Sequence, residues 1–276
     1  MMPDFAIPTN HENPPYNYTI FEEYFYNRFS KERPDTCKEY LPVCWTNYYV
    51  AKNYGKDDMS DLQLYLDSLD EDKEYFTVVQ WDDGILHNTK NLDLYSFASG
   101  GMGDYAYPLN CTPRPDTVSI KPKRELLCSF VGAIEGRHVV RQKMKYYFHE
   151  YDDIFISEWM GVTGFEMAMK SSIFALCPRG YGKTSFRICE ALHCGTIPVY
   201  IYDEPWIPFH DMVDFESYGV LGSAKKLRHL YGYLSMMSQN KINDMRDAGR
   251  EVYKKYYSYE GCYDRILDKL NEWKDV

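Results

Sequence analysis

The stretch that most constrains the fold is residues 173–203, which read IFALCPRGYGKTSFRICEALHCGTIPVYIYD. Two short apolar runs, Ile173–Cys177 and Ile197–Ile201, are each typical of a buried β-strand. The segment between them begins with proline and glycine residues, which predict a loop, and continues as a helix that ends before Gly195. A strand, a loop, a helix and a second strand in this order form the basic unit of a parallel α/β sheet.

The start of this helix is predicted to bind an anion. Thr184 or Ser185 can cap it, which leaves its free amides and positive dipole end at the carboxyl edge of the sheet. Arg179, Lys183 and Arg187 place three cations around the same point. Phosphate is the natural partner of such an arrangement.

A carboxylate one turn further along the helix suggests a nucleotide. Glu190 follows Arg187 by three residues, so the two side chains share one face of the helix. A guanidinium suits phosphate oxygens and a carboxylate suits ribose hydroxyls, although the same spacing also describes an ordinary exposed ion pair. The predicted donor-binding residues of this segment are Arg179, Gly180, Tyr181, Gly182, Lys183, Thr184, Ser185, Arg187 and Glu190.

Two other classes of function fit parts of the pattern. The GKT run at 182–184 could end the P-loop of an NTPase or kinase, but that motif needs a glycine where Cys177 stands. Pro178 also removes one amide from a phosphate cradle. A sugar-nucleotide site is therefore favoured over a P-loop. A catalytically silent glycan-binding module is the third alternative.

A candidate general base follows another predicted strand. The run at 75–80, YFTVVQ, leads into Trp81, Asp82, Asp83 and Gly84. Ligands of open α/β sheets lie beyond the carboxyl ends of strands, and a carboxylate there can act as a general base. Either Asp82 or Asp83 can take this role, although Asp-Asp-Gly is also the composition of a simple turn. Trp81 either stacks on an acceptor sugar or belongs to the core.

Charge and cysteine usage exclude several classes of partner. The net charge of −10 argues against nucleic acid or an anionic membrane as the main partner. The eight cysteines form no CxxC pair and no zinc-like spacing, so we expect reduced thiols and no metal site. The polar N-terminus and the lack of a long apolar run predict no signal peptide, no transmembrane segment and a cytoplasmic location.

The rest of the chain adds elements of the same kind. Periodicity predicts a helix at Tyr18–Lys31, a strand at Tyr40–Val50 and a further strand at Leu126–Ile134. A proline-rich stretch at 111–123 is typical of a domain boundary, and Cys262–Lys274 predicts a last helix.

The central run and the segment after it resemble a known family. LCPRGYGKTSFRICEALHCGTIPVYI, followed by PWIPFHDMVDFESYGVL, resembles the signature of the exostosin-like glycosyltransferases, family 47. The shared features are a strand that ends in Pro-x-Gly, a Ser-Phe-Arg helix start, Glu-Ala-Leu, Ile-Pro-Val and an Ile-Pro-Phe turn. Cellular members usually carry an N-terminal membrane anchor, so this chain looks like the soluble forms that large algal viruses encode.

The resemblance implies a fold and a reaction. The fold is of the GT-B type, with two Rossmann-like α/β domains facing an interdomain cleft. Residues 1–120 would hold the acceptor, 121–256 the nucleotide-sugar, and 257–276 would return to the first domain. The reaction is inverting transfer of a sugar from a nucleotide-sugar, usually a UDP-sugar, to a glycan hydroxyl.

The resemblance also adds one donor ligand and leaves the substrates open. The family's strand-Gly-x-Arg arrangement implies that Arg137 lies near the donor diphosphate. No metal ion or other cofactor is expected. Xylose, glucuronic acid, galactose and N-acetylhexosamine donors all occur in the family, and the residues here select none of them. They do not specify the acceptor or the oligomeric state either.

Overall fold

The computed structural model describes residues 20–111, 118, 122–135 and 138–273. The chain divides into two compact units: a first unit of residues 1–112 and 259–276, and a second unit of residues 113–258. The division expected from the sequence was 1–120, 121–256 and 257–276. Each unit is an α/β structure with its own parallel sheet, which confirms the predicted fold class at that level.

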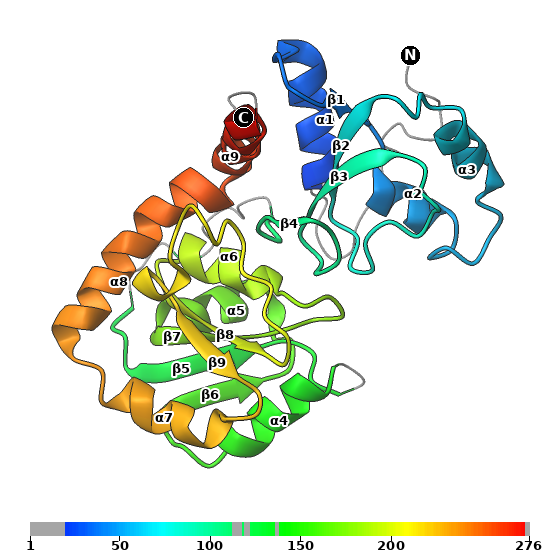
Figure 1. Cartoon of the computed structure of the whole chain (residues 1–276). Coiled ribbons are helices and arrows are strands. Elements are labelled where there is room, and N and C mark those ends of the chain that lie inside the picture. Colours follow the sequence, from blue (N-terminus) through cyan, green and yellow to red (C-terminus); the bar gives the residue numbers. More distant parts are fainter. Residues whose placement is uncertain (1–19, 112–117, 119–121, 136–137, 274–276) are drawn as a thin grey trace. The chain divides into compact units, whose positions relative to one another are not determined.

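The first unit contains a four-stranded parallel sheet in the order β1-β2-β3-β4. The two central strands have six residues each and the two edge strands have two, with Thr77 of β2 opposite Ser96 of β3. Four helices accompany the sheet. The elements, shown in Figure 1, are α1 (Phe21–Glu32), β1 (Glu39–Tyr40), α2 (Trp45–Ala51), α3 (Ser60–Asp67), β2 (Glu74–Val79), β3 (Asp93–Ala98), β4 (Tyr105–Ala106) and α9 (Tyr259–Glu272).

The last helix completes the core of the first unit. Phe21 and Phe25 of α1 contact Tyr259 and Tyr263 of α9, with ring centroids 5.5 and 4.9 Å apart. All four rings are buried, so each contributes apolar area that would otherwise face water. The two ends of the described chain therefore form one hydrophobic core.

The prediction of a strand at Tyr40–Val50 is wrong for most of its length. Only Tyr40 lies in a strand, and the segment from Trp45 onward forms α2. Trp45, Tyr48 and Tyr49 are buried and lie three and four residues apart, which is the spacing of one helix face. Their aromatic side chains favour strands in general, but here packing outweighs that preference.

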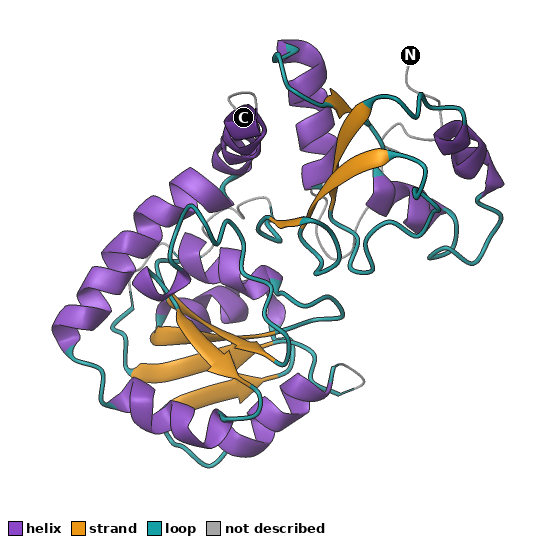
Figure 2. Cartoon of the chain, in the orientation of Figure 1, coloured by secondary structure: helices purple, strands orange, loops and turns teal. Residues whose placement is uncertain are grey.

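The second unit contains a five-stranded parallel sheet in the order β6-β5-β7-β8-β9. Helices α4 and α7 lie on one face, and α5, α6 and α8 lie on the other (Figure 2). The strands are β5 (Leu126–Val131), β6 (Ile154–Ser157), β7 (Ser172–Pro178), β8 (Ile197–Tyr202) and β9 (Val220–Ser223). The helices are α4 (Val139–Phe148), α5 (Gly161–Lys170), α6 (Phe186–His193), α7 (Leu227–Ser235) and α8 (Gln239–Val252), followed by a π-helical turn at Tyr253–Tyr257.

The strand–loop–helix–strand unit predicted from residues 173–203 is confirmed as β7, α6 and β8. The two strands pair in parallel, with Phe174 opposite Ile197 and Cys177 opposite Tyr200. Gly195 ends the helix with a φ of +64°, a conformation that glycine adopts without strain. The loop between β7 and α6 therefore begins at the carboxyl edge of a parallel sheet, as predicted.

The sequence predicts reduced thiols and no transmembrane segment, and the cysteines and helices of the structure bear on these two expectations. All eight cysteines are free thiols, as predicted, and five of them are buried. Among the described residues, no helix is both long enough and apolar enough to cross a membrane.

Candidate functional site

Arg179 donates hydrogen bonds to backbone carbonyls of its own loop, the one between β7 and α6. The Nε of Arg179 donates to the carbonyl of Gly182 at 3.0 Å, and Nη2 donates to the carbonyl of Tyr181 at 2.8 Å. Its Nη1 pairs with Asp203 Oδ1, which follows β8, at 2.7 Å. Burial alone would raise the pKa of Asp203, but the hydrogen bond from Arg179 helps to lower it below the ordinary value. Arg179 therefore holds the loop in shape.

Most of the remaining polar groups of this loop are also engaged. The amide of Gly180 donates to the carbonyl of Thr184 at 2.9 Å. Lys183 Nζ pairs with Glu204 Oε2 at 2.9 Å, and the carbonyl of Lys183 accepts from the Tyr200 hydroxyl. Two of the three predicted cations, Arg179 and Lys183, are thus paired with carboxylates that follow β8. The Tyr181 side chain remains largely exposed.

Helix α6 begins as the sequence indicates. Ser185 is its N-cap residue, and its Oγ accepts a hydrogen bond from the Arg187 amide at 3.3 Å. Thr184, the other predicted cap, is buried just before it. The side chain of Arg187 extends from this first turn toward the end of β5.

Arg187 and Glu190 form a mostly buried pair. Arg187 Nη1 lies 2.9 Å from Glu190 Oε2, and the two side chains are only 15% and 12% exposed. Arg187 Nη2 donates to the carbonyl of Val131, the last residue of β5, at 2.5 Å. The guanidinium also lies over the ring of Phe165, 4.3 Å from its centroid. The alternative of an ordinary exposed ion pair does not describe this geometry.

The Arg187 guanidinium keeps donors that these contacts do not use. It carries five N–H groups, and its two hydrogen bonds to Glu190 and Val131 employ two of them. Its Nε is buried and has no hydrogen-bond partner among the described residues. A side chain at Gly132 would begin 3.1 Å from Nη2, so the glycine keeps this approach open. Arg137 lies outside the described residues.

Two residues that the sequence analysis did not single out tie α4 to this loop. Arg141 Nε donates to the carbonyl of Arg179 at 3.2 Å, and its Nη1 donates to the carbonyl of Ala133 at 2.9 Å. His138 Nε2 lies 3.5 Å from Asp203 Oδ2. Burial lowers the pKa of His138, and the positive charge of the nearby Arg179 lowers it further. Their roles depend on β5, β7 and β8 lying side by side, so sequence spacing alone gives no signal for them.

The predicted base lies in the first unit, at the carboxyl end of β2. Trp81, Asp82 and Asp83 form a turn that closes with a 3.1 Å hydrogen bond from the Gly84 amide to the Trp81 carbonyl. Asp82 is partly buried and Asp83 is exposed. Trp81 is partly buried, so its exposure does not decide between the core position and the acceptor-stacking position that the sequence allows. The base candidates therefore belong to one unit and the described donor candidates to the other.

A glycine loop supports this turn. A Cβ at Gly100 would lie 2.4 Å from the Asp82 Cα and 2.6 Å from the Trp81 carbonyl oxygen. A Cβ at Gly84 would lie 2.8 Å from the carbonyl oxygen of Met102. The glycines therefore allow two backbone segments to pack directly against each other, which fixes the position of the two aspartates.

A buried carboxylate, Glu22 of α1, lies beneath the same turn. Its Oε1 accepts from the Gln80 amide at 2.5 Å, and its Oε2 accepts from the Thr46 amide at 2.8 Å. Burial raises the pKa of Glu22 to about 7, although hydrogen bonds from Gln80, Thr46 and Trp81 act in the opposite direction. Glu22 thus joins α1 and α2 to the end of β2. Nothing in the local sequence distinguishes it from its neighbour Glu23.

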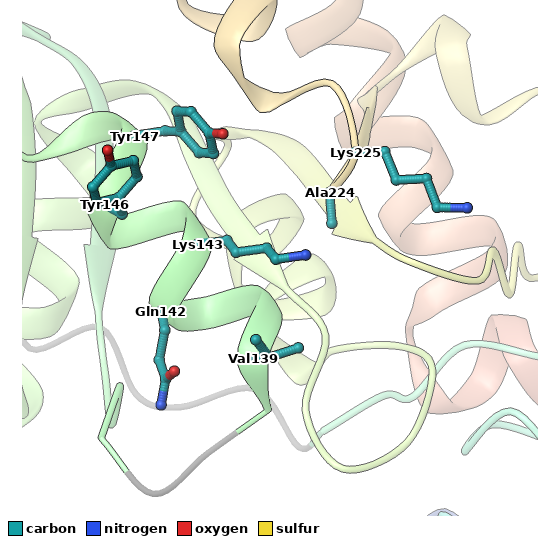
Figure 3. Close-up of a pocket in the computed structure, with 7 residues that line it drawn as sticks. All are labelled: Val139, Gln142, Lys143, Tyr146, Tyr147, Ala224 and Lys225. Atoms are coloured by element: carbon teal, nitrogen blue, oxygen red, sulfur yellow. The ribbon is translucent and has the colours of Figure 1, made fainter.

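The second unit also has an open hollow between α4 and the turn after β9. Its volume is about 530 Å³. In Figure 3, Lys143 extends from α4 toward Ala224, with Lys225 beyond it. The remaining lining residues are Val139, Gln142, Tyr146 and Tyr147. None of the donor candidates that the structure describes lines this hollow.

Comparison with known proteins places the chain in a family. A family model described as the Exostosin GT47 domain matches residues 80–237, more than half of the chain. The chain belongs to the exostosin GT47 family. The resemblance noted at Leu176–Leu221 is thereby confirmed, and the matched stretch includes Trp81, Asp82, Asp83 and the whole β7–α6 segment.

Individual GT47 relatives and one solved structure give the extent of the likeness. An exostosin-1 homolog from Caenorhabditis elegans is 29% identical over 104 residues, which cover 37% of this chain and 27% of that protein. A probable glycosyltransferase from Arabidopsis thaliana is 32% identical over 118 residues, which cover 42% of this chain and 22% of that protein. The match thus spans about a quarter of these relatives. The crystal structure of TarM aligns with a TM-score of 0.42 and 7% identity, over 75% of this chain and 52% of TarM, and this loose likeness carries no argument.

Metal binding was not expected from the sequence. Within the described ranges, no group of three or more His, Cys, Asp or Glu side chains could hold a metal ion. The expectation of a metal-independent site stays a prediction.

The raised pKa of Glu22 predicts a pH dependence of stability. The folded chain keeps this carboxyl protonated up to about pH 7, whereas the unfolded chain ionises it above its ordinary value of 4.5. The stabilising contribution is therefore fully present below pH 4.5 and is lost as the pH rises through 7. Relative to Glu22→Gln, the wild type should lose about 2 kcal/mol of unfolding free energy between pH 5 and pH 8. Urea unfolding of both proteins measures this, and an equal difference at the two pH values contradicts it.

Gly100→Ala should destabilise the turn that carries Asp82 and Asp83. The new methyl group would overlap the backbone of Trp81 and Asp82, so we expect the unfolding free energy to fall by about 1–3 kcal/mol. Gly232→Ala in α7 is the matched control, because its Cβ would meet no described atom within 4 Å outside its own helix backbone. Alanine there should be neutral or stabilising by up to about 1 kcal/mol. Equal stability of the two variants in urea would refute the steric argument.

Proposed function

We propose that this chain is an inverting glycosyltransferase that moves a sugar from a nucleotide-sugar, with UDP as the carrier, to a glycan hydroxyl. The observation that supports this most is the mostly buried Arg187–Glu190 pair at the carboxyl edge of the second sheet, inside the GT47 match. The unused N–H groups of Arg187 suit a diphosphate, and the carboxylate of Glu190 suits ribose hydroxyls. The pair therefore has the chemistry of a nucleotide site.

The proposed reaction is a single displacement at the anomeric carbon. Asp82 or Asp83 accepts the proton of the acceptor hydroxyl while the hydroxyl oxygen attacks that carbon. The bond to the diphosphate oxygen breaks on the opposite face, so the configuration inverts and UDP leaves. Arg187, Arg137 and the first amides of α6 stabilise the negative charge on the leaving group. The scheme requires no metal ion, so transfer should persist in EDTA.

The roles of the remaining candidates follow from their contacts. Arg179 and Lys183 position the loop through Asp203 and Glu204 rather than by direct contact with phosphate. Gly180, Tyr181, Gly182, Thr184 and Ser185 supply the loop and the cap on which Arg187 depends. Trp81 supplies an aromatic surface for the acceptor, next to the base.

Arg187→Ala should weaken UDP binding by about 1.5–3 kcal/mol, the value of a charge-assisted hydrogen bond. Isothermal titration of UDP onto the wild type and the variant measures this, after circular dichroism has shown that the variant folds. Arg228→Ala on the exposed face of α7 is the matched control and should bind UDP as the wild type does. Unchanged UDP affinity in folded Arg187→Ala would refute the donor site. A P-loop NTPase would instead bind and hydrolyse Mg-ATP, and a silent module would bind glycan but not UDP.

Replacing the base should greatly slow turnover and leave donor affinity intact. We expect Asp82→Asn or Asp83→Asn to reduce kcat by about 10²–10⁴-fold, because the acceptor hydroxyl loses its proton acceptor. The assay follows UDP release from UDP-sugars of xylose, glucuronic acid, galactose and N-acetylhexosamine, with glycan acceptors present. The variant that loses turnover at unchanged UDP affinity identifies the base. Full activity in both variants rules out this turn as its source.

A further inference from the structure

The chain forms an unusual turn at residues 52–55, directly after helix α2. The amide of Tyr54 donates to the Tyr49 carbonyl at 2.8 Å, which is the six-residue closure of a Schellman motif. Asn53 takes the left-handed position at φ +49°, as Asn often does, and Tyr54 continues in the same region at φ +60°. A left-handed Tyr is uncommon and strained, so a structural or functional reason should exist for it.

The turn places the Tyr54 ring in solvent next to Trp81. The Tyr54 side chain is 64% exposed, so burial does not repay the backbone strain. Its ring centroid lies 6.1 Å from that of Trp81, at an interplanar angle of 34°. On its other side, Trp81 lies 5.6 Å from the buried ring of Tyr49. The three rings form a row that runs from the core of the first unit to its surface.

The inner end of this row is held rigidly. The Tyr49 hydroxyl accepts from the Leu86 amide at 2.9 Å and lies 3.0 Å from His87 Nδ1. His87 Nε2 lies 3.3 Å from the Met59 carbonyl, so it carries the proton and Nδ1 accepts from Tyr49. Burial lowers the pKa of His87, which keeps this neutral arrangement. The inner ring against which Trp81 packs is therefore fixed in advance of any ligand.

We propose that Tyr54 and Trp81 together form a stacking surface for one sugar ring of the acceptor glycan, directly beside Asp82 and Asp83. This inference rests on the proposed function and adds the class of acceptor. Aromatic rings bind the C–H face of a sugar, and that face is widest in pyranoses whose hydroxyls are equatorial. The two carboxylates that follow Trp81 disfavour an acidic ring at this position. The acceptor residue here is thus a neutral pyranose with equatorial hydroxyls, such as glucose, xylose or N-acetylglucosamine.

Replacing Tyr54 by glycine separates binding from structure. Glycine adopts the left-handed conformation without strain, so Tyr54→Gly should melt at the wild-type temperature or above. It should nevertheless bind neutral glycans about 5–10-fold more weakly, because one of the two rings is lost. Tyr54→Phe should bind as the wild type does. Tyr233→Ala removes a similarly exposed tyrosine, 56% exposed on α7 of the second unit, and should change neither property.

The experiment is calorimetric titration of the whole chain with cellotetraose, xylotetraose, chitotetraose and tetragalacturonic acid. We expect at least one neutral tetrasaccharide to bind more tightly than the acidic one, and Tyr54→Gly to bind it about 5–10-fold more weakly. The proposal is overturned if no neutral tetrasaccharide binds the wild type, if the acidic one binds best, or if Tyr54→Gly binds unchanged. A lower melting temperature of Tyr54→Gly also overturns it, because it would show that the ring serves the fold. UDP titration of the same samples tests the donor site separately, so failure of either idea is recognised.

Discussion

The Arg187 guanidinium, enclosed between an aromatic ring and the end of a strand, is the interaction on which the rest of the second unit depends. A charge removed from water costs several kcal/mol unless its donors find partners. Here Glu190 and the Val131 carbonyl supply part of that compensation, and the ring of Phe165 covers one face. The buried Nε of Arg187 has no hydrogen-bond partner among the residues that the structure describes. In the proposed site, a diphosphate would supply both negative charge and acceptor atoms.

The first unit encloses an ionisable side chain in a similar way. Glu22 lies at the end of β2 as Arg187 lies near the end of β5, and each binds backbone groups at the carboxyl end of a parallel strand. The amides of Gln80 and Thr46 donate to the buried Glu22 carboxyl group, so the turn with Asp82 and Asp83 starts from a fixed backbone. Glu22 lies beneath the turn of the proposed base, whereas Arg187 is itself proposed to contact the donor. Such support is what a preorganised site requires.

Local patterns predicted the elements well and the contacts poorly. β7, α6 and β8 follow from apolar runs, a serine cap and a glycine stop, all of which act over a few residues. α2 was misread because its aromatic residues favour strands until a core collects them on one face. Arg179 was predicted to bind phosphate, but its guanidinium turns back onto the carbonyls of its own loop. The sequence gives the charge of a side chain but not the direction in which the side chain points. The role of Glu22 could not be predicted from local sequence, because its partner Gln80 lies 58 residues away.

The discontinuity of the first unit has a consequence for how the chain is made. Phe21 and Phe25 are synthesised 238 residues before the rings they pack against, Tyr259 and Tyr263. The second unit, by contrast, is contiguous and can close its core while translation continues. The nascent first unit therefore lacks two of its core rings until Tyr259 and Tyr263 have been added. Its hydrophobic core can close only after α9 has left the ribosome, so the first unit is expected to complete its folding after the second.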